Sequence, residues 1–275
     1  MLPFLPSGPT ELVGTVPASR IQRAMQAASG SALSEVVGRA VARIAEAHLG
    51  QPLSVERVPA GGGRRAVEQT LEGADEAVLL LASEALCVHA AVERPALGRL
   101  VDRLRPVATC IGVPYLLVKA GGGGGDCTIA SAGHGGRSTA IARRLAADPA
   151  TVPGTTCREV TFNGGAAALH ALLGGQVEMA VLPQALVAPW TGPGGLPAAA
   201  VPSSADGLPA EGWFAVLAPP GWPAARADAL GAALRAGLAD PVQQAWLERL
   251  GLRALPEPGA VLARRIRAER ERVRG

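Results

Sequence analysis

A recurring unit of strand, small-residue turn and helix is the feature that most constrains the fold of this chain. Short apolar runs that predict strands lead into turns containing glycine or serine, and a helical stretch follows each turn. The unit occurs four times, after Ala27, Val58, Ser131 and Phe162. Strands that alternate with helices in this way are typical of an α/β fold with a mostly parallel sheet.

The alternation predicts strands and helices of ordinary length along most of the chain. We expect strands at residues 21–27, 53–58, 77–82, 127–131, 158–162, 177–182 and 213–218. Two further apolar segments between residues 106 and 118 are predicted to be separated by Pro114. We expect helices at residues 34–49, 64–71, 138–147 and 166–173, and two more after Pro223, which is well suited to a helix start.

The turns of these units favour anion binding. The first N–H groups of a helix have no partner within the helix, and the helix dipole is positive at that end. A small-residue turn therefore presents an anion site that needs no cationic side chain. Because such turns meet at the carboxyl ends of parallel strands, the sequence predicts a shared anion-binding crevice there.

Size and charge favour two lobes and argue against nucleic-acid binding. The 275 residues are 48% hydrophobic and 18% charged, which is enough apolar material for two cores. The net charge is only +3, and aromatic residues are scarce at 3%. The basic run at residues 264–274 is interrupted by Glu269 and Glu271, so we interpret it as a solvated helix face.

The four cysteines do not suggest a metal site. They have no C-x-x-C spacing and no histidine at ligand distance, and we expect no metal and no cofactor. A disulfide is compatible with the sequence but its pairing stays open, and buried free thiols are the alternative. No apolar stretch reaches the ~20 residues that span a bilayer, and residues 1–19 show no secretory signal pattern.

Catalytic interpretations lack the residues they require. The histidine in the Gly133-His134-Gly135 sequence could belong to an esterase oxyanion loop, but the chain has no G-x-S-x-G nucleophile motif. Ser131 has no evident general base. The glycines at 121–125 are followed by Asp-Cys, whereas a phosphate loop needs Lys-Ser or Lys-Thr. We therefore expect no enzymatic activity.

Four ordered segments resemble one family, the solute receptors of tripartite tricarboxylate transporters (the Bug or TctC-like family). The resemblance extends from about Ser19 to the C-terminus. The segments are LGQP at 49–52 with glycines at 61–63, ASAGHG at 130–135, VTFNGG at 160–165 with LLGGQVE at 172–178, and WFAVLAPPG at 213–221.

The resemblance implies the type II architecture of periplasmic binding proteins, with two α/β lobes, hinge strands and a ligand cleft. It places lobe 1 at residues 19–107 and 217–275 and lobe 2 at 108–216, after an extension at residues 1–18. It also implies a small organic carboxylate as ligand, membrane transporter subunits as partners, a monomer, and a periplasmic location.

The family's binding positions, carried onto this chain, give a list of candidate ligand-binding residues. They are Ser29, Gly30, Ser31, Ser83, Ser131, Gly133, His134, Gly135, Gly136, Arg137, Phe162, Asn163, Gly164 and Gly165. The list uses the turn at 29–31 as the first binding loop, although residues 3–11 also resemble that loop.

Two candidate positions depart from the family pattern. Asn163 replaces a lysine of the family, and Arg137 stands where the family has a small hydroxyl residue. Arg137 is interpreted mainly as a solvated residue at a helix start, where a cation is unfavourable and an anion would compensate.

The sequence leaves three hypotheses in order of preference. The first is a receptor that closes around a carboxylate for a transporter. The second is an intracellular ligand sensor on the same fold, which the missing secretory signal favours. The third is an esterase-like enzyme.

Overall fold

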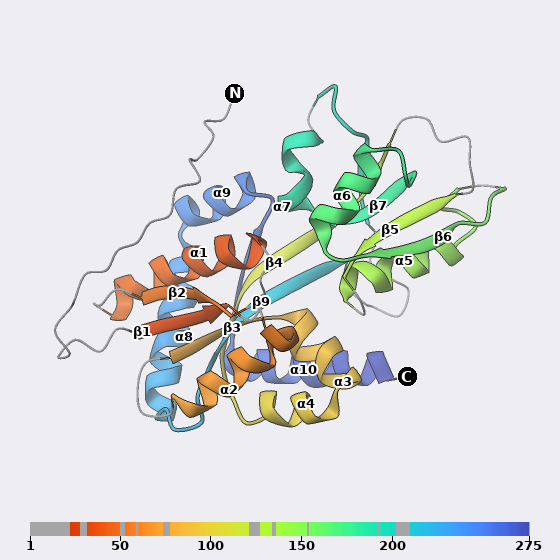
Figure 1. Ribbon diagram of the computed structural model, residues 1–275. Coiled ribbons are helices and arrows are strands. Elements are labelled where there is room, and N and C mark those ends of the chain that lie inside the picture. The colour runs from red at the N-terminus through yellow and green to blue at the C-terminus, as the bar shows by residue number, and fades with distance from the viewer. Residues whose placement is uncertain are drawn as a thin grey trace, which may run out of the picture.

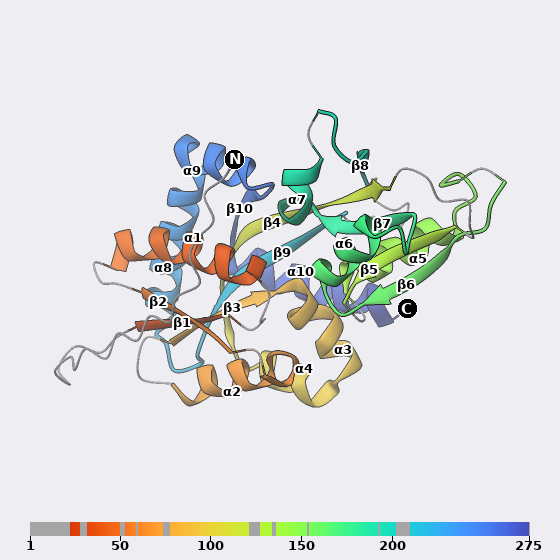
Figure 2. The same cartoon turned by 45° about the horizontal axis from the view of Figure 1, so that its top comes forward.

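The chain folds into two α/β lobes joined by long strands (Figures 1 and 2). The computed structural model describes residues 23–27, 32–49, 53–58, 60–73, 78–120, 127–133, 136–152, 154–191, 193–201 and 210–274. The predicted extension at 1–18 and the glycine run at 121–125 lie outside these residues.

Among the described residues, ten strands form one continuous sheet whose main order is β2-β1-β3-β9-β4-β7-β5-β6, with β10 and β8 also paired to β4. The strands of lobe 1 are β1 (Arg23–Ala27), β2 (Leu53–Arg57), β3 (Val78–Ser83), β9 (Glu211–Ala218), β10 (Arg253–Pro258) and the first part of β4 (Arg105–Lys119). The strands of lobe 2 are β5 (Thr128–Ala132), β6 (Arg158–Phe162), β7 (Met179–Pro183), β8 (Ala198–Ala200) and the rest of β4.

The sheet is mixed. The strands of the predicted repeating units, β1 to β3 in one lobe and β5 to β7 in the other, pair in parallel as expected. The strands between them, β9 and β4, run antiparallel to their neighbours. Each lobe therefore has a parallel part whose carboxyl ends face the other lobe, and antiparallel strands connect the two.

Strand β4 is continuous through Pro114, where the sequence predicted a break. Residues up to Pro114 pair with β9, and residues from Tyr115 onward pair with β7 and β8. Proline lacks an N–H donor, and a strand tolerates it where the regular ladder is interrupted. Here that place is the change of sheet between Pro114 and Tyr115.

Helices cover both faces of the lobe 1 sheet (Figure 2). The helices that share the core of one face are α1 (Ala32–Leu49), α8 (Ala224–Ala239) and α9 (Pro241–Arg249). On the other face lie η1 (Ala60–Gly63), α2 (Arg64–Glu72), the π-helical turn η2 (Ala85–Ala90), α3 (Ala91–Glu93), α4 (Pro95–Val101) and α10 (Gly259–Arg274).

The C-terminal part differs from the sequence prediction in two ways. Three helices follow Pro223 instead of two, and β10 separates the second from the third. Helix α10 is also not a simple solvated face, because Glu269 and Arg270 are buried. Arg270 donates hydrogen bonds to the Cys87 carbonyl oxygen at 2.7 Å and to Asp102 Oδ1 at 2.6 Å, which binds the helix to the rest of lobe 1.

Lobe 2 is smaller and has one principal helix on each face. Helix α5 (Arg137–Ala147) packs on one face, and α6 (Gly165–Leu173) with α7 (Gln184–Val187) packs on the other, followed by the short turn η3 (Ala188–Trp190). No helix in the described ranges is long and apolar enough to cross a membrane.

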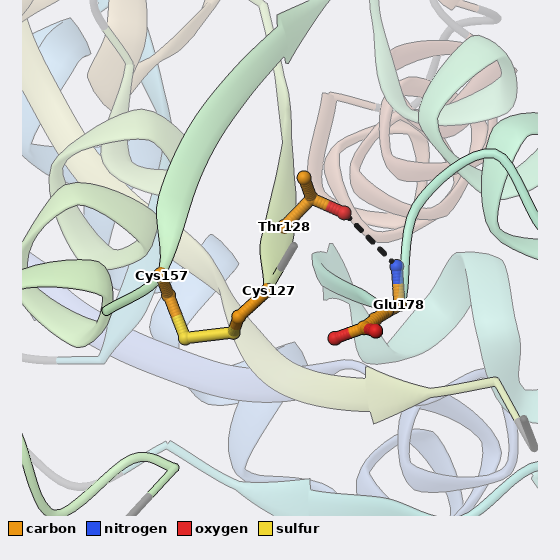
Figure 3. Close-up of a disulfide and its surroundings, with 4 residues drawn as sticks. All are labelled: Cys127, Thr128, Cys157 and Glu178. Atoms are coloured by element: carbon orange, nitrogen blue, oxygen red, sulfur yellow. Dashed lines mark hydrogen bonds between the residues drawn. A yellow bond between two sulfur atoms is a disulfide. The ribbon is translucent and has the colours of Figure 1, made fainter. Parts of the chain in front are cut away.

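The cysteines divide into one pair and two buried thiols. Cys127 and Cys157 form a disulfide at the start of the paired strands β5 and β6 (Figure 3). Next to it, Glu178 N donates a hydrogen bond to Thr128 Oγ1. Cys87 and Cys110 are free, and burial raises the pKa of each thiol to about 12. Both alternatives that the sequence left open therefore occur.

Candidate ligand-binding cleft

A cavity of about 600 Å³ lies between the two lobes, within the usual size range of small-molecule sites. Its walls come from the start of α1, the end of β3, the middle of β4, the ends of β5 and β7, the β6–α6 turn and the start of β9. The lining residues are Leu33, Ser34, Ser83, Glu84, Ala85, Val113, Tyr115, Ala132, Asn163, Gly164, Gly165, Ala166, Pro183, Leu186, Gly212, Trp213 and Phe214.

The β6–α6 turn provides the backbone donors of this cavity. Gly164 has φ +95°, a conformation that favours glycine, and its N–H donates to the Phe162 carbonyl at 2.8 Å. The first bond of the helix runs from Ala168 N to the Gly164 carbonyl, so the N–H groups of Gly165 and Ala166 precede the intrahelical ladder. Both residues line the cavity, and the positive end of α6 therefore faces it.

Gly165 also packs closely against the wall of the cavity. A Cβ atom at this position would stand 2.7 Å from Leu186 Cδ2, which is closer than packed atoms approach. Since Leu186 itself lines the cavity, a larger side chain at residue 165 must displace this wall or enter the cavity.

Glu84 brings a negative charge to the lobe 1 side of the cavity. The residue is 3% exposed, and its Oε1 lies 2.8 Å from His89 Nε2 and 3.5 Å from Arg137 Nη2. Burial alone would raise the pKa of Glu84, but the hydrogen bond with His89 and the charge of Arg137 together lower it below its ordinary value. Glu84 is therefore a carboxylate at neutral pH.

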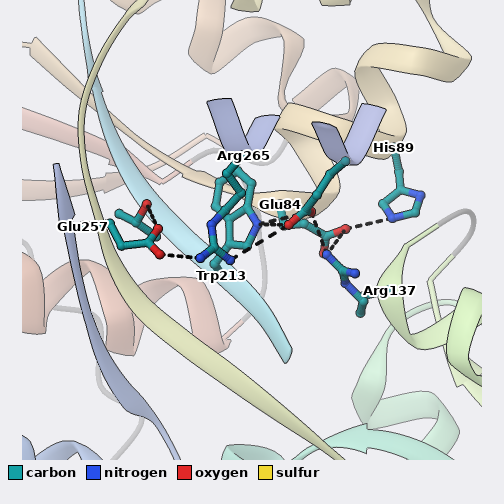
Figure 4. Close-up of polar contacts among 8 residues, drawn as sticks. Glu84, His89, Arg137, Trp213, Glu257 and Arg265 are labelled. Atoms are coloured by element: carbon teal, nitrogen blue, oxygen red, sulfur yellow. Dashed lines mark hydrogen bonds and ion pairs between the residues drawn. The ribbon is translucent and has the colours of Figure 1, made fainter. Parts of the chain in front are cut away.

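Arg137 connects the lobes through a buried cluster (Figure 4). It begins helix α5 of lobe 2, is 1% exposed, and donates from Nη2 to Glu269 Oε2 of lobe 1 at 2.7 Å. Trp213 Nε1 donates to the same carboxylate at 3.2 Å. The expectation of a solvated Arg137 is therefore wrong, and the anions that compensate it are Glu84 and Glu269 of the protein itself.

The pKa of Glu269 in this cluster is raised above its ordinary value, with burial as the main cause. Burial raises the pKa of Glu269, and Glu84 adds to this effect, while Arg137, Trp213 and Arg265 oppose it. Arg265 pairs mainly with Glu257, which also accepts a hydrogen bond from Thr109 Oγ1 at 3.0 Å. Two carboxylates thus share Arg137, and Glu269 has the shorter contact.

Ser131 lies behind the cavity wall. Its side chain is fully buried and donates to Glu159 Oε1 at 2.6 Å, and its Oγ lies 3.1 Å from Thr139 Oγ1. A partner carboxylate at this distance could suggest an activated hydroxyl, but a fully buried hydroxyl cannot meet a substrate. The serine therefore connects β5 to β6 and α5.

The candidate residues fall into three groups. Ser83, Asn163, Gly164 and Gly165 line the cavity. Ser131, Gly133, Gly136, Arg137 and Phe162 are described but do not belong to its lining. Ser29, Gly30, Ser31, His134 and Gly135 lie outside the described residues.

Several lining residues were missed by sequence reasoning. Glu84 had a usable signal in the sequence, because it is a charged residue that directly follows a buried strand. Ser83, which was predicted, is the polar residue at the end of the same strand. Tyr115 gave a weaker signal as the chain's single tyrosine, and Gly212 gave none. No group of three or more metal-binding side chains occurs among the residues with described positions.

The fold and the cleft together define a structural class, the two-lobed α/β proteins with a cavity between the lobes. No protein-family model and no curated protein sequence matches the chain.

Solved structures of this class are similar over nearly the whole chain. R. palustris Rpa4515 with adipate has a TM-score of 0.75 at 17% identity, covering 91% of this chain and 94% of that one. MatC from Rhodopseudomonas palustris with bound malate has a TM-score of 0.69 at 24% identity, covering 92% of this chain and 97% of that one. The periplasmic binding protein BugD has a TM-score of 0.68 at 21% identity, covering 92% of this chain and 95% of that one. The predicted two-lobed fold is confirmed, and these neighbours include the Bug-type proteins that the sequence motifs resemble.

Proposed function

We propose that this protein is a solute-binding receptor that closes around a small organic carboxylate and delivers it to a transporter. The observation that carries the proposal is the interlobe cavity with the N-terminus of α6 at its wall. Gly165 and Ala166 offer backbone N–H groups there, and Ser83 and Asn163 add side-chain polar groups. Adipate and malate in the solved structures of similar fold support this ligand class.

In this proposal, ligand binding favours the closed arrangement of the two lobes. We take residues 23–114 and 211–274 as lobe 1 and residues 115–210 as lobe 2, following the change of sheet. A ligand that contacts α6 in one lobe and the end of β3 in the other binds the closed arrangement better than the open one. This difference in affinity shifts the population toward closure.

A ligand panel tests the proposal directly. Monocarboxylates, dicarboxylates, aromatic acids and amino acids are titrated by calorimetry, and at least one is expected to bind and to raise the Tm. If none binds, the receptor proposal fails. Native mass spectrometry of the purified protein is a useful first step, because retained ligand would identify the compound.

A charge placed at the start of α6 tests the site. Gly165→Glu puts a carboxylate where the ligand carboxylate is expected, and we expect binding to fall by at least a hundredfold while the fold is kept. His170→Glu is the matched control, since it adds the same charge on the exposed side of the same helix. Equal affinity of both variants would remove the α6 start from the site.

The location and partners follow from the same proposal. A disulfide between Cys127 and Cys157 favours an oxidising compartment such as the periplasm over the cytosol, and so supports the receptor over the intracellular sensor. The transporter subunits and the monomeric state are inferred from the family resemblance. Cell fractionation with the natural start of the gene separates receptor from sensor.

We also propose that the protein performs no chemistry. Ser131 is the candidate nucleophile of the esterase hypothesis, and its hydroxyl is fully buried behind the cavity. Incubation with a set of carboxylic esters, followed by product analysis, tests this point. Release of acid above the uncatalysed rate would contradict it.

A further inference from the structure

We propose that Glu84 makes the cleft selective for amino-carboxylate zwitterions, with the ligand carboxylate at the start of α6 and its ammonium group at Glu84. The inference rests on the proposed receptor function and narrows its ligand class. It separates this chain from receptors for dicarboxylates, because a second ligand carboxylate would meet a carboxylate of the protein.

The first observation is the charge of the wall. Of the described residues that line the cavity, Glu84 is the one with a formal charge, and the remaining polar groups are hydroxyls, an amide, the Trp213 indole and backbone. The donors for an anion are the N–H groups at the start of α6 in lobe 2, whereas Glu84 belongs to lobe 1. The two lobes therefore offer groups of opposite character to one ligand.

The second observation is the position of the Glu84 carboxylate at the wall. Gly212 lines the cavity on β9, and a Cβ atom there would stand 3.5 Å from Glu84 Oε2 and 3.7 Å from the Tyr115 hydroxyl. Because Gly212 has no side chain, nothing from this residue covers Oε2. Glu84 Oε2 and the Tyr115 hydroxyl thus both lie beside Gly212 at the cavity wall, where each can accept a hydrogen bond from an ammonium group.

The third observation is incomplete compensation within the protein. Arg137 Nη2 lies 2.7 Å from Glu269 Oε2 but 3.5 Å from Glu84 Oε1, so its shorter and stronger contact goes to Glu269. Arg265, the next cation, pairs with Glu257 and lies 4.0 Å from Glu269. His89 Nε2, at 2.8 Å, and Arg137 both contact Oε1 of Glu84, whereas Oε2 is the oxygen beside Gly212 at the cavity wall. Negative charge at Oε2 attracts a cation in the cavity and repels an anion.

The experiment compares matched ligands on the full-length protein. Calorimetry measures ω-amino acids and dicarboxylates of equal chain length from three to six carbons, for example γ-aminobutyrate and succinate, with the corresponding monocarboxylates and α-amino acids. At the best chain length we expect the amino acid to bind at least tenfold more tightly than the dicarboxylate. A dicarboxylate that binds more tightly than every amino acid overturns the inference.

Two substitutions identify the residue responsible. Glu84→Gln is expected to reduce the ratio of amino-acid to dicarboxylate affinity at least tenfold. Asp102→Asn removes a carboxylate of lobe 1 that pairs with Arg270 and does not line the cavity, so this control is expected to keep the wild-type ratio. An unchanged ratio in Glu84→Gln, or the same loss in both variants, contradicts the role of Glu84.

A third variant covers the case in which Glu84→Gln does not fold. Gly212→Ala places a methyl group at ordinary contact distance from Oε2 without altering the ion pairs, and should weaken amino-acid binding more than monocarboxylate binding. Equal weakening of both contradicts the inference. Tight dicarboxylate binding with no effect of Glu84 leaves the receptor function standing, whereas no binding of any carboxylate overturns both.

Discussion

Glu159 is a clear case of a single residue that organises its surroundings. Its carboxylate accepts hydrogen bonds of 2.6 Å from both Ser131 and Thr161, and Arg143 Nε lies 3.4 Å away. Burial raises the pKa of Glu159, but these hydrogen bonds and the Arg143 charge outweigh burial and lower it. The ionised form is therefore the one that stabilises β5, β6 and α5.

The pH dependence of stability follows from that direction. A carboxyl whose pKa is lowered in the folded state stabilises the protein above its unfolded pKa, and this stabilisation is lost as the pH falls through the folded pKa. We expect Glu159→Gln to cost about 1 kcal/mol at pH 7 in urea unfolding, with the difference from wild type shrinking in acid. A difference that is constant between pH 7 and pH 3 would contradict this.

At the scale of elements, the start of α6 depends on backbone conformation more than on packing. A Cβ atom on Gly164 would meet nothing within 4 Å, but its φ of +95° strains any other residue. We expect Gly164→Ala to destabilise the protein by about 1–3 kcal/mol, measured by denaturant unfolding. Gly136 at the start of α5 is the control, since its φ is −93° and its surroundings are equally open. Equal effects of both alanines would exclude strain as the cause.

The disulfide stabilises lobe 2 at the end of the sheet that lies away from the cleft. Cys127 and Cys157 are 30 residues apart, and closing a loop of this length is expected to contribute about 3–4 kcal/mol. Replacing both cysteines by serine should lower the free energy of unfolding by about that amount. Ligand affinity should stay within about twofold, because neither cysteine lines the cavity. A loss of binding by the folded variant would contradict this separation.

At the scale of the whole molecule, Arg137 holds the lobes together. Removing one member of a buried ion cluster leaves its partners uncompensated, which costs about 3–5 kcal/mol. We expect Arg137→Met to lose about this much, and the further change Glu269→Gln to restore part of it, both measured by chemical denaturation. Arg143→Met, which removes an exposed arginine, should cost less than about 1 kcal/mol. A loss under 1 kcal/mol in Arg137→Met would contradict the cluster's role.

Local pattern was sufficient for most of the fold. Helix α1 was predicted within two residues of its start, and β6 at its exact limits, because apolar periodicity is a short-range property. The prediction from local pattern failed at β4. A proline normally ends a strand, but pairing with distant strands keeps Pro114 within β4. The prediction also failed at α10, where Glu269 was interpreted as one charge of a solvated run although it is buried and pairs with Arg137, which is distant in the chain.

The sequence by itself determined the alternating α/β architecture and the glycine turn at 164–165, because each depends on residues close together in the chain, whereas the two lobes were implied by the family resemblance. Only the tertiary structure decided which of these turns line one cavity and which side chains share it. Glu84, Arg137 and Glu269 are separated by 53 and then 132 residues, so no local pattern relates them. Their charges interact only because folding removes them from water and brings two lobes into contact, and this long-range electrostatics sets the character of the cleft.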